Sequence, residues 1–183
     1  MTKTRILGID TGGKTGYAII DKTEIENEKA NAKIWDLVAT GIIEFKPVTE
    51  CKSKNRLATD GTLDYYAQIA ALYRTYQPSF VVYESPFFGE FVSTIISLVQ
   101  KVTIIKLAIR LEYPEALIIE VPPSEWRKSL GIKQPKRKKG EPSIIKDLSI
   151  GAIAQIMGVA PQTLTLAYTE HEIEAIGIAL SKV

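Results

Sequence analysis

The N-terminal segment places an acid at the end of a short strand, directly before a glycine turn. Residues 5–10 read RILGID, a β-type run that ends in Asp10, and Gly12 and Gly13 follow in the sequence TGGKTG. A second β-type run over residues 15–21 completes the pattern of a hairpin. Because the chain turns sharply after Asp10, the carboxylate can point out of the sheet edge instead of into the core. The alternative is an aspartate that only starts a turn.

The segments that follow predict a sheet with mixed strand directions. A polar stretch over residues 22–33 leads into a third β-branched run, so the chain begins with a three-stranded meander. Two later apolar runs are typical of buried parallel strands, and helices separate them. The expected strands are residues 5–10, 15–21, 34–45, 80–83 and 117–121. The expected helices are residues 63–76, 91–112, 124–130, 143–157 and 170–181.

The order of these elements predicts one α/β domain over residues 1–183. We expect a five-stranded mixed sheet, with three antiparallel strands and then two parallel ones, flanked by helices. The 183 residues, 45% of them hydrophobic, suffice for one such core. The single cysteine, Cys51, excludes an intrachain disulfide and favours a reducing, cytoplasmic location. The most apolar stretch, residues 91–111, contains Lys101 and Lys106, which are costly inside a bilayer, so we expect no membrane span.

Positive charge is concentrated in one segment, although the net charge is only +2. The sequence KQPKRKK over residues 133–139 holds five cations and no acid, and Pro135 favours a loop. Such a segment is basic enough to bind phosphate groups, so we expect a contact with nucleic acid. The candidate contact residues are Arg127, Lys128, Lys133, Lys136, Arg137, Lys138, Lys139 and Lys146. The alternative is that these side chains are only solvated.

A second acid closes a strand that otherwise has the composition of a buried one. Glu84 follows the run FVVY. Functional sites gather at strand ends in α/β sheets, and a buried carboxylate is costly unless it is paired or bound to a metal. Glu84 is therefore a candidate metal ligand. The alternative is a solvated strand end before a turn at Pro86.

The last helix begins with three acids and the only histidine of the chain. Thr169 and Glu172 match a capping box, which indicates a structural role for Glu172. The helix dipole explains Glu170 equally well. His171 and Glu174 are three residues apart, so they are neighbours on one helical face and could share a ligand. The alternative for His171 is a partly exposed residue at the helix start.

These candidates suggest the chemistry of a metal-dependent hydrolase. Asp10, Glu84, His171 and Glu174 could hold two divalent ions about 3.5 to 4 Å apart. Carboxylates suit Mg²⁺, and an imidazole ligand shifts the preference toward Mn²⁺. We therefore expect Mg²⁺ or Mn²⁺ as cofactor and higher activity with Mn²⁺.

Four blocks resemble, in order, the RuvC-type Holliday junction resolvases of the ribonuclease H-like superfamily. GIDTGGKTGYAII is similar to the family's first strand, turn and second strand, and VVYESPFF to its second acidic motif with a downstream aromatic. VPPSEWRKSLG resembles its proline-started segment with a lysine, and HEIEAIGIAL its final helix with two metal ligands. The resemblance implies the ribonuclease H-like fold and an endonuclease that cuts four-way or other branched DNA by two-metal-ion hydrolysis.

The resemblance also assigns roles to the residues that match these motifs. It implies that Asp10, Glu84 and Glu174 are the catalytic carboxylates and that His171 is the remaining ligand. The family usually has two aspartates three residues apart in its final helix, so the His171 and Glu174 pair is a departure, and the longer Glu174 needs an adjusted metal position.

Further implied roles concern DNA and the partner subunit. Phe87 or Phe88 would stack on an unpaired base, although one of them could instead pack in the core. Lys146 would lie near the scissile phosphate and Lys128 at another basic position. A junction with two-fold symmetry that is cut twice implies a homodimer. The apolar helix over residues 91–111 is a candidate for the shared surface, with burial inside one subunit as the alternative.

Other functions remain open at this point. A nuclease of the same fold could act on RNA or on an RNA–DNA hybrid. The sequence DTGG after a strand also resembles the phosphate-binding turn of actin-like ATP-dependent phosphotransferases, but that fold needs two such domains. An inactive binding module is disfavoured because four potential ligands stand in the expected order.

Overall fold

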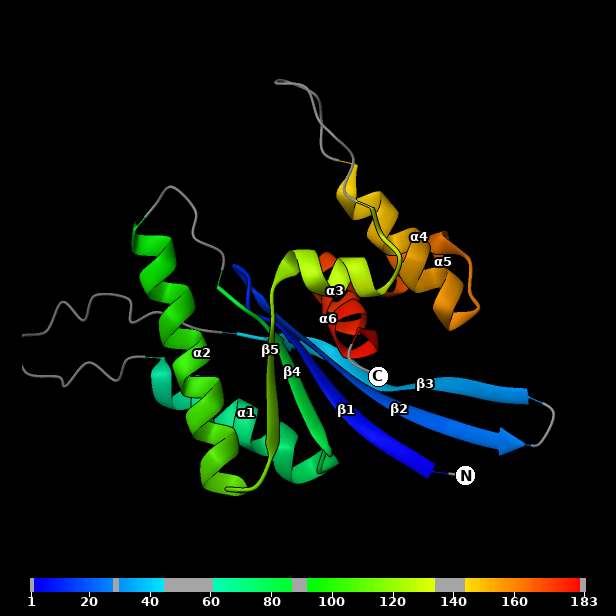
Figure 1. Ribbon diagram of the computed structural model, residues 1–183. Helices are drawn as coiled ribbons and strands as arrows, with labels where there is room; N and C mark the ends of the chain where they lie inside the picture. Colours follow the sequence, from blue (N-terminus) through cyan, green and yellow to red (C-terminus); the bar gives the residue numbers. More distant parts are fainter. Residues whose placement is uncertain (1, 28–29, 45–60, 87–91, 134–143, 182–183) are drawn as a thin grey trace, which may run out of the picture.

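The computed structural model describes residues 2–27, 30–44, 61–86, 92–133 and 144–181, which form one mixed sheet with helices on both faces (Figure 1). The strand order is β3-β2-β1-β4-β5. β1 (Thr2–Asp10), β2 (Thr15–Asn27) and β3 (Ala30–Ile43) pair antiparallel. β4 (Phe80–Glu84) runs parallel to β1, and β5 (Leu117–Val121) runs parallel to β4. The predicted sheet is confirmed.

The hairpin of β2 and β3 is longer than the sequence predicts. The interpretation of residues 22–33 as a polar connection is wrong, because β2 continues to Asn27 and β3 begins at Ala30. Thr23 and Ile25 alternate with charged residues, which is the period of a strand with one polar face. Glu24 lies directly opposite Lys33, and opposite charges in this position stabilise a strand pair.

The helices lie close to the predicted positions, with one addition. The described residues form α1 (Thr62–Tyr76), α2 (Val92–Glu112), α3 (Pro123–Ser129), α4 (Ile145–Met157), α5 (Pro161–Ala167) and α6 (Glu170–Leu180). The sequence did not predict α5. Pro161 at its first position and the left-handed Gly158 after α4 are local signals of helix boundaries. The seven residues of α5 are too few to show apolar periodicity.

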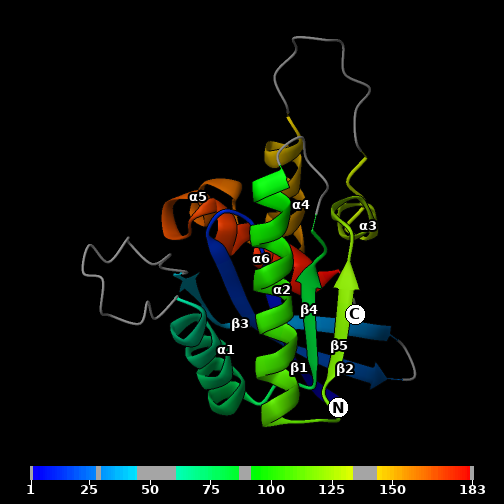
Figure 2. The same cartoon turned by 90° about the vertical axis from the view of Figure 1, so that its left-hand side faces the viewer.

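Alternate residues of the central strands build two hydrophobic cores, one on each face of the sheet. The first core lies beneath α1 and α2, and its strand residues include Leu7, Ile19 and Val81. The second core lies beneath α6 and its neighbours, and its strand residues include Ile6, Ala18 and Val82. Figures 1 and 2 show α1 and α2 on one side of the sheet and α6 on the other. Each buried strand therefore contributes to both cores, as expected for strands covered on both faces.

α6 lies directly on β1 and β2 because two glycines leave no side chain between them. A Cβ atom at Gly8 would stand 2.3 Å from the carbonyl oxygen of Ala175. A Cβ atom at Gly16 would stand 2.1 Å from the carbonyl oxygen of His171. The close approach sets the position of the first turn of α6 relative to the end of β1.

Among the described residues, no single helix is long and apolar enough to cross a membrane. The pair α4 and α5, which is bent by 103°, meets the criteria of length and composition only when its two helices are taken together.

Candidate metal centre

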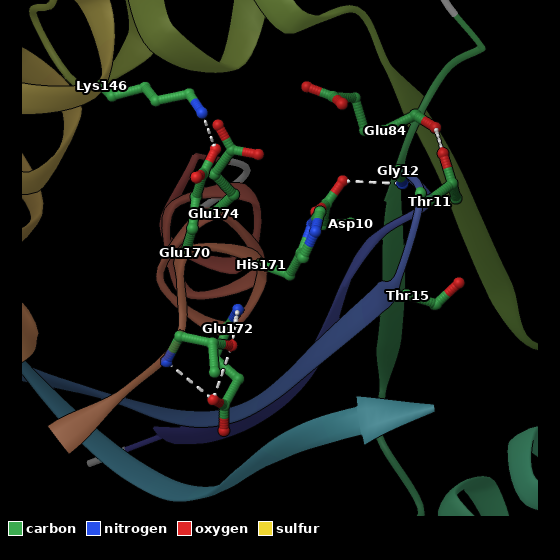
Figure 3. Close-up of polar contacts among 12 residues, drawn as sticks. Asp10, Thr11, Gly12, Thr15, Glu84, Lys146, Glu170, His171, Glu172 and Glu174 are labelled. Atoms are coloured by element: carbon green, nitrogen blue, oxygen red, sulfur yellow. Dashed lines mark hydrogen bonds and ion pairs between the residues drawn. The ribbon is translucent and has the colours of Figure 1, made fainter. Parts of the chain in front are cut away.

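Asp10 ends β1 and lies buried between the β1–β2 turn and α6. Its side chain is 2% exposed. The backbone N–H of Gly12 donates a 3.0 Å hydrogen bond to Oδ1, and Nδ1 of His171 lies 2.6 Å from Oδ2 (Figure 3). The hydrogen bond from His171 to Asp10 is the main reason why the pKa of His171 is raised above its ordinary value. If Nδ1 carries the proton, Nε2 is free to bind a metal.

The first turn of α6 is fixed by its cap. The Thr169 hydroxyl accepts from the backbone N–H of Glu172, and the Glu172 carboxylate accepts from the backbone N–H of Thr169, so the predicted capping box is confirmed. Glu170, in the same turn, forms an ion pair with Lys146. The cap leaves His171 and Glu174 to face the end of β1.

The structure brings Asp10, His171 and Glu174 together. One potential ligand atom from each residue lies within 4.8 Å of the other two. Burial is the main cause of a raised pKa of Glu174, and the charge of Asp10 adds to it. Nη2 of Arg127 lies 3.3 Å from Oε1 of Glu174 and acts in the opposite direction. Two carboxylates and one imidazole are a donor set that fits Mg²⁺ or Mn²⁺.

Glu84, at the end of β4, lies beside this group but not in it. Nε1 of Trp126 donates a 2.7 Å hydrogen bond to its carboxylate, and the Thr11 hydroxyl donates a 3.0 Å hydrogen bond to its backbone carbonyl. Burial, together with the charges of Asp10 and Glu174, raises the pKa of Glu84 to about 7. In the view of Figure 3, the Glu84 side chain lies above Asp10, and α6 lies to the left of Asp10.

Two residues around the centre were not predicted from the sequence as site residues. Trp126 is fully buried and holds Glu84 from α3. Lys101 of α2 reaches the β1–β2 turn. The sequence signal for Trp126 is its place beside Arg127 in the segment VPPSEWRKSLG, and the signal for Lys101 is a charge within an apolar helix.

The predicted DNA-binding residues lie partly outside the described residues. Lys128 and Lys133 are exposed, and together with Arg127 they line a pocket of about 340 Å³ between α3 and α4. Lys146 lies near the centre but is paired with Glu170. Phe87, Phe88, Lys136, Arg137, Lys138 and Lys139 fall outside the described residues.

Comparison with solved structures identifies the fold. RuvC from Thermus thermophilus matches with a TM-score of 0.67 at 16% identity, over 97% of this chain and 92% of that one. T. thermophilus RuvC in complex with Holliday junction substrate matches with a TM-score of 0.66 at 15% identity, over the same shares. The yeast mitochondrial Holliday junction resolvase Ydc2 matches with a TM-score of 0.52 at 11% identity, over 96% of this chain and 77% of that one.

No family model and no curated protein matches the sequence. The solved structures show that the chain has the fold of RuvC, in agreement with the fold that the sequence resemblance implies, at low sequence identity.

Proposed function

We propose that this protein is a metal-dependent endonuclease that cuts four-way or other branched DNA. The observation that carries the proposal is the grouping of Asp10, His171 and Glu174 at one end of the central strand in a RuvC-type fold. A solved structure of this fold is a complex with Holliday junction substrate. The motif order of the sequence supports the same function.

The catalytic residues in this proposal are Asp10, Glu84, His171 and Glu174. Asp10, His171 and Glu174 would hold one divalent ion. Glu84 would contribute a ligand to a second ion beside it. Bound ions of this kind supply an activated water and neutralise charge on the scissile phosphate. The protein holds Asp10 and Glu84 in place from outside the centre, through the Gly12 amide and the Trp126 indole.

Basic residues on the adjoining surface bind the DNA backbone in this proposal. Arg127 lines the pocket between α3 and α4 and also donates a hydrogen bond to Glu174. A DNA strand bound along Lys128 and Lys133 would therefore reach the candidate centre. Phosphate contacts position nucleic acid without reading its sequence. The sequence alone adds Lys136 to Lys139 and the aromatic pair Phe87 and Phe88 to the proposed DNA contacts.

The active form in this proposal is a homodimer that uses the outer face of α2. The exposed fractions are 53% for Ile96, 46% for Val99, 51% for Leu107 and 63% for Leu111. With Thr103, which is also exposed, these side chains follow one stripe of the helix. An apolar stripe of this length is typical of a protein contact, and two copies related by a two-fold axis would present two centres to a junction.

The nuclease activity is tested with labelled four-way junction, linear duplex and RNA–DNA hybrid in the presence of Mn²⁺. The expected result is cleavage of the junction by the wild type, a loss of at least about 100-fold in Asp10→Asn and little change in Asp36→Asn, an exposed acid of β3. Preferential cleavage of the hybrid would instead support the RNA-processing alternative. Activity that survives in Asp10→Asn would exclude this centre.

The dimer is tested by sedimentation of the wild type and of Leu107→Glu. The expected result is a dimer that dissociates in the variant. Leu166→Glu is the matched control, because Leu166 is 88% exposed on α5, away from α2. A monomeric wild type, or a variant that remains dimeric, would contradict this surface.

A further inference from the structure

Lys101 is a buried cation in the middle of the apolar helix α2. It is 3% exposed, and its ammonium group donates hydrogen bonds to the carbonyl oxygens of Gly12 at 2.7 Å and Gly13 at 2.9 Å. The next lysine of the helix, Lys106, is instead exposed and paired with Glu120 at 3.3 Å. One lysine of α2 thus points into the β1–β2 turn while the other remains at the surface.

The contacts of Lys101 continue without a gap to the candidate centre. The ammonium group donates a hydrogen bond to the carbonyl oxygen of Gly12, and the backbone N–H of Gly12 donates one to Oδ1 of Asp10 at 3.0 Å. The other oxygen of Asp10 meets Nδ1 of His171 at 2.6 Å. Space around the turn is limited, since a Cβ atom at Gly12 would lie 3.2 Å from Oδ1 of Asp10. A shift of the turn would therefore move the carboxylate.

Core stability does not explain a lysine at this position. Burial lowers the pKa of Lys101, which is the direction expected when an ammonium group loses water, and the charge of Asp10 opposes it. An aliphatic side chain would fill the same place in an apolar helix without that cost. The two carbonyl groups that receive the ammonium protons belong to the turn next to Asp10. The cost is consistent with a role in holding the turn.

We propose that Lys101 is a positioning residue: it fixes the Gly12–Gly13 turn, so that the Gly12 amide orients the Asp10 carboxylate toward His171 and toward a bound divalent ion. The part of this inference that concerns the ion rests on the proposed function. The part that concerns Asp10 and His171 can be tested in the metal-free protein.

The first test uses the fact that His171 is the only histidine of the chain. In ¹⁵N-labelled metal-free protein, the wild type is expected to show one protected imidazole N–H proton, from Nδ1 donating to Asp10. Lys101→Met keeps the unbranched stem of the side chain without the ammonium group, so it cannot donate, and it is expected to lose this signal to exchange with water. Lys106→Met, from the same helix, should retain it. An unchanged signal in Lys101→Met would overturn the proposal.

The second test measures Mn²⁺ affinity by electron paramagnetic resonance. Loss of a residue that orients a metal ligand indirectly typically weakens metal binding by about tenfold or more, so the dissociation constant of Lys101→Met should rise about tenfold. If Lys101 acted only as a nearby positive charge, its removal would tighten binding. The two explanations thus predict opposite signs, and tighter or unchanged binding would contradict positioning.

Two further variants separate positioning from general loss of stability. Ile105→Val removes a methyl group from the core side of α2 and should leave both readouts unchanged. Lys101→Gln can still donate to one carbonyl and should give intermediate values, which also carries the test if Lys101→Met does not fold. A wild type that binds no Mn²⁺ would remove the proposed nuclease function, whereas the imidazole signal would still decide the role of Lys101.

Discussion

Trp126 and Glu84 are joined by a 2.7 Å hydrogen bond from a fully buried indole to a carboxylate at a strand end. The indole offers one donor and no charge, so the carboxylate remains disfavoured in its ionised form, with a pKa raised to about 7. Glu84 is therefore held in position but is costly to the metal-free fold. This balance leads to the first two predictions.

Glu84→Gln should stabilise the metal-free protein at alkaline pH. Because the folded pKa of Glu84 is raised from 4.5 to about 7, its stabilising contribution is present below pH 4.5 and is lost as the pH rises through 7. Glutamine can still accept from Trp126 and remains neutral. We expect a gain of about 1 to 3 kcal/mol above pH 7 and none at acidic pH, measured by urea unfolding in EDTA. Glu125→Gln, an exposed acid of α3, is the control; equal gains in both variants would contradict the explanation.

Trp126→Phe should shift the pH dependence of metal binding upward. The hydrogen bond from Trp126 lowers the pKa of Glu84. Without it, the pKa of Glu84 rises, and a proton competes with the metal ion up to a higher pH. We expect the midpoint of Mn²⁺ binding against pH to rise and junction cleavage near neutral pH to fall about tenfold or more. The other tryptophan provides the control, since Trp35→Phe alters a half-buried ring of β3. The proposed role of Trp126 would be excluded by an unmoved midpoint.

His171 should determine the preference between metals. A nitrogen ligand favours Mn²⁺ over Mg²⁺, so the wild type should cleave faster with Mn²⁺. His171→Asp replaces this ligand by oxygen, and the ratio of the Mn²⁺ rate to the Mg²⁺ rate should fall. Rates are compared at saturating concentrations of each ion. Equal wild-type rates under these conditions would count against His171 as a ligand.

The ionised carboxylate of Asp21 should stabilise the fold through its ion pairs with Arg5 and Lys3. Nε of Arg5 lies 2.7 Å from the carboxylate of Asp21, and Nζ of Lys3 lies 2.8 Å from it. The hydrogen bond from Arg5 is the main cause of the lowered pKa of Asp21. The contribution is present above the ordinary value of 3.8 and is lost as the pH falls through the lower folded value. Asp21→Asn should cost about 1 to 3 kcal/mol at neutral pH, measured by urea unfolding. Asp36, its exposed cross-strand neighbour, provides the control Asp36→Asn, with a change near zero.

The basic segment should set the salt dependence of DNA binding. Each phosphate neutralised by a cation contributes about −0.9 to the slope of log affinity against log salt. Replacing Lys133, Lys136, Arg137, Lys138 and Lys139 by alanine should therefore flatten the slope, measured by fluorescence anisotropy on a four-way junction. A slope that matches the wild type would mean that these side chains are only solvated.

Local sequence patterns predicted much of the fold. The five strands and the capping box of α6 follow from periodicity and from residues within a few positions of each other. The long hairpin was missed because alternating charged residues also occur in polar connections, and Glu24 and Lys33 become partners only when the strands pair. α5 was missed because seven residues carry too little periodicity.

The candidate metal centre, like the fold, could be predicted only in part from the sequence. Strand ends and the spacing of His171 and Glu174 indicated residues that the structure brings near Asp10. The sequence could not show that Trp126 donates a hydrogen bond to the carboxylate of Glu84, because the two residues are 42 positions apart. It also could not show that Lys101 reaches the turn after β1, because Lys101 and Gly12 are 89 positions apart. Contacts at such separations depend on how helices are placed on the sheet, which no local pattern contains.

The bare backbone at Gly8 and Gly16 makes the position of α6 sensitive to the smallest possible addition. A single methyl group at either glycine acts as a wedge beneath a helix that carries two of the proposed ligands, so it would displace both of them at once. The geometry of the centre thus depends on the absence of side chains at Gly8 and Gly16 as much as on the ligands. A redesign of its metal specificity should change residues on the face of α6 and keep glycine at these two strand positions.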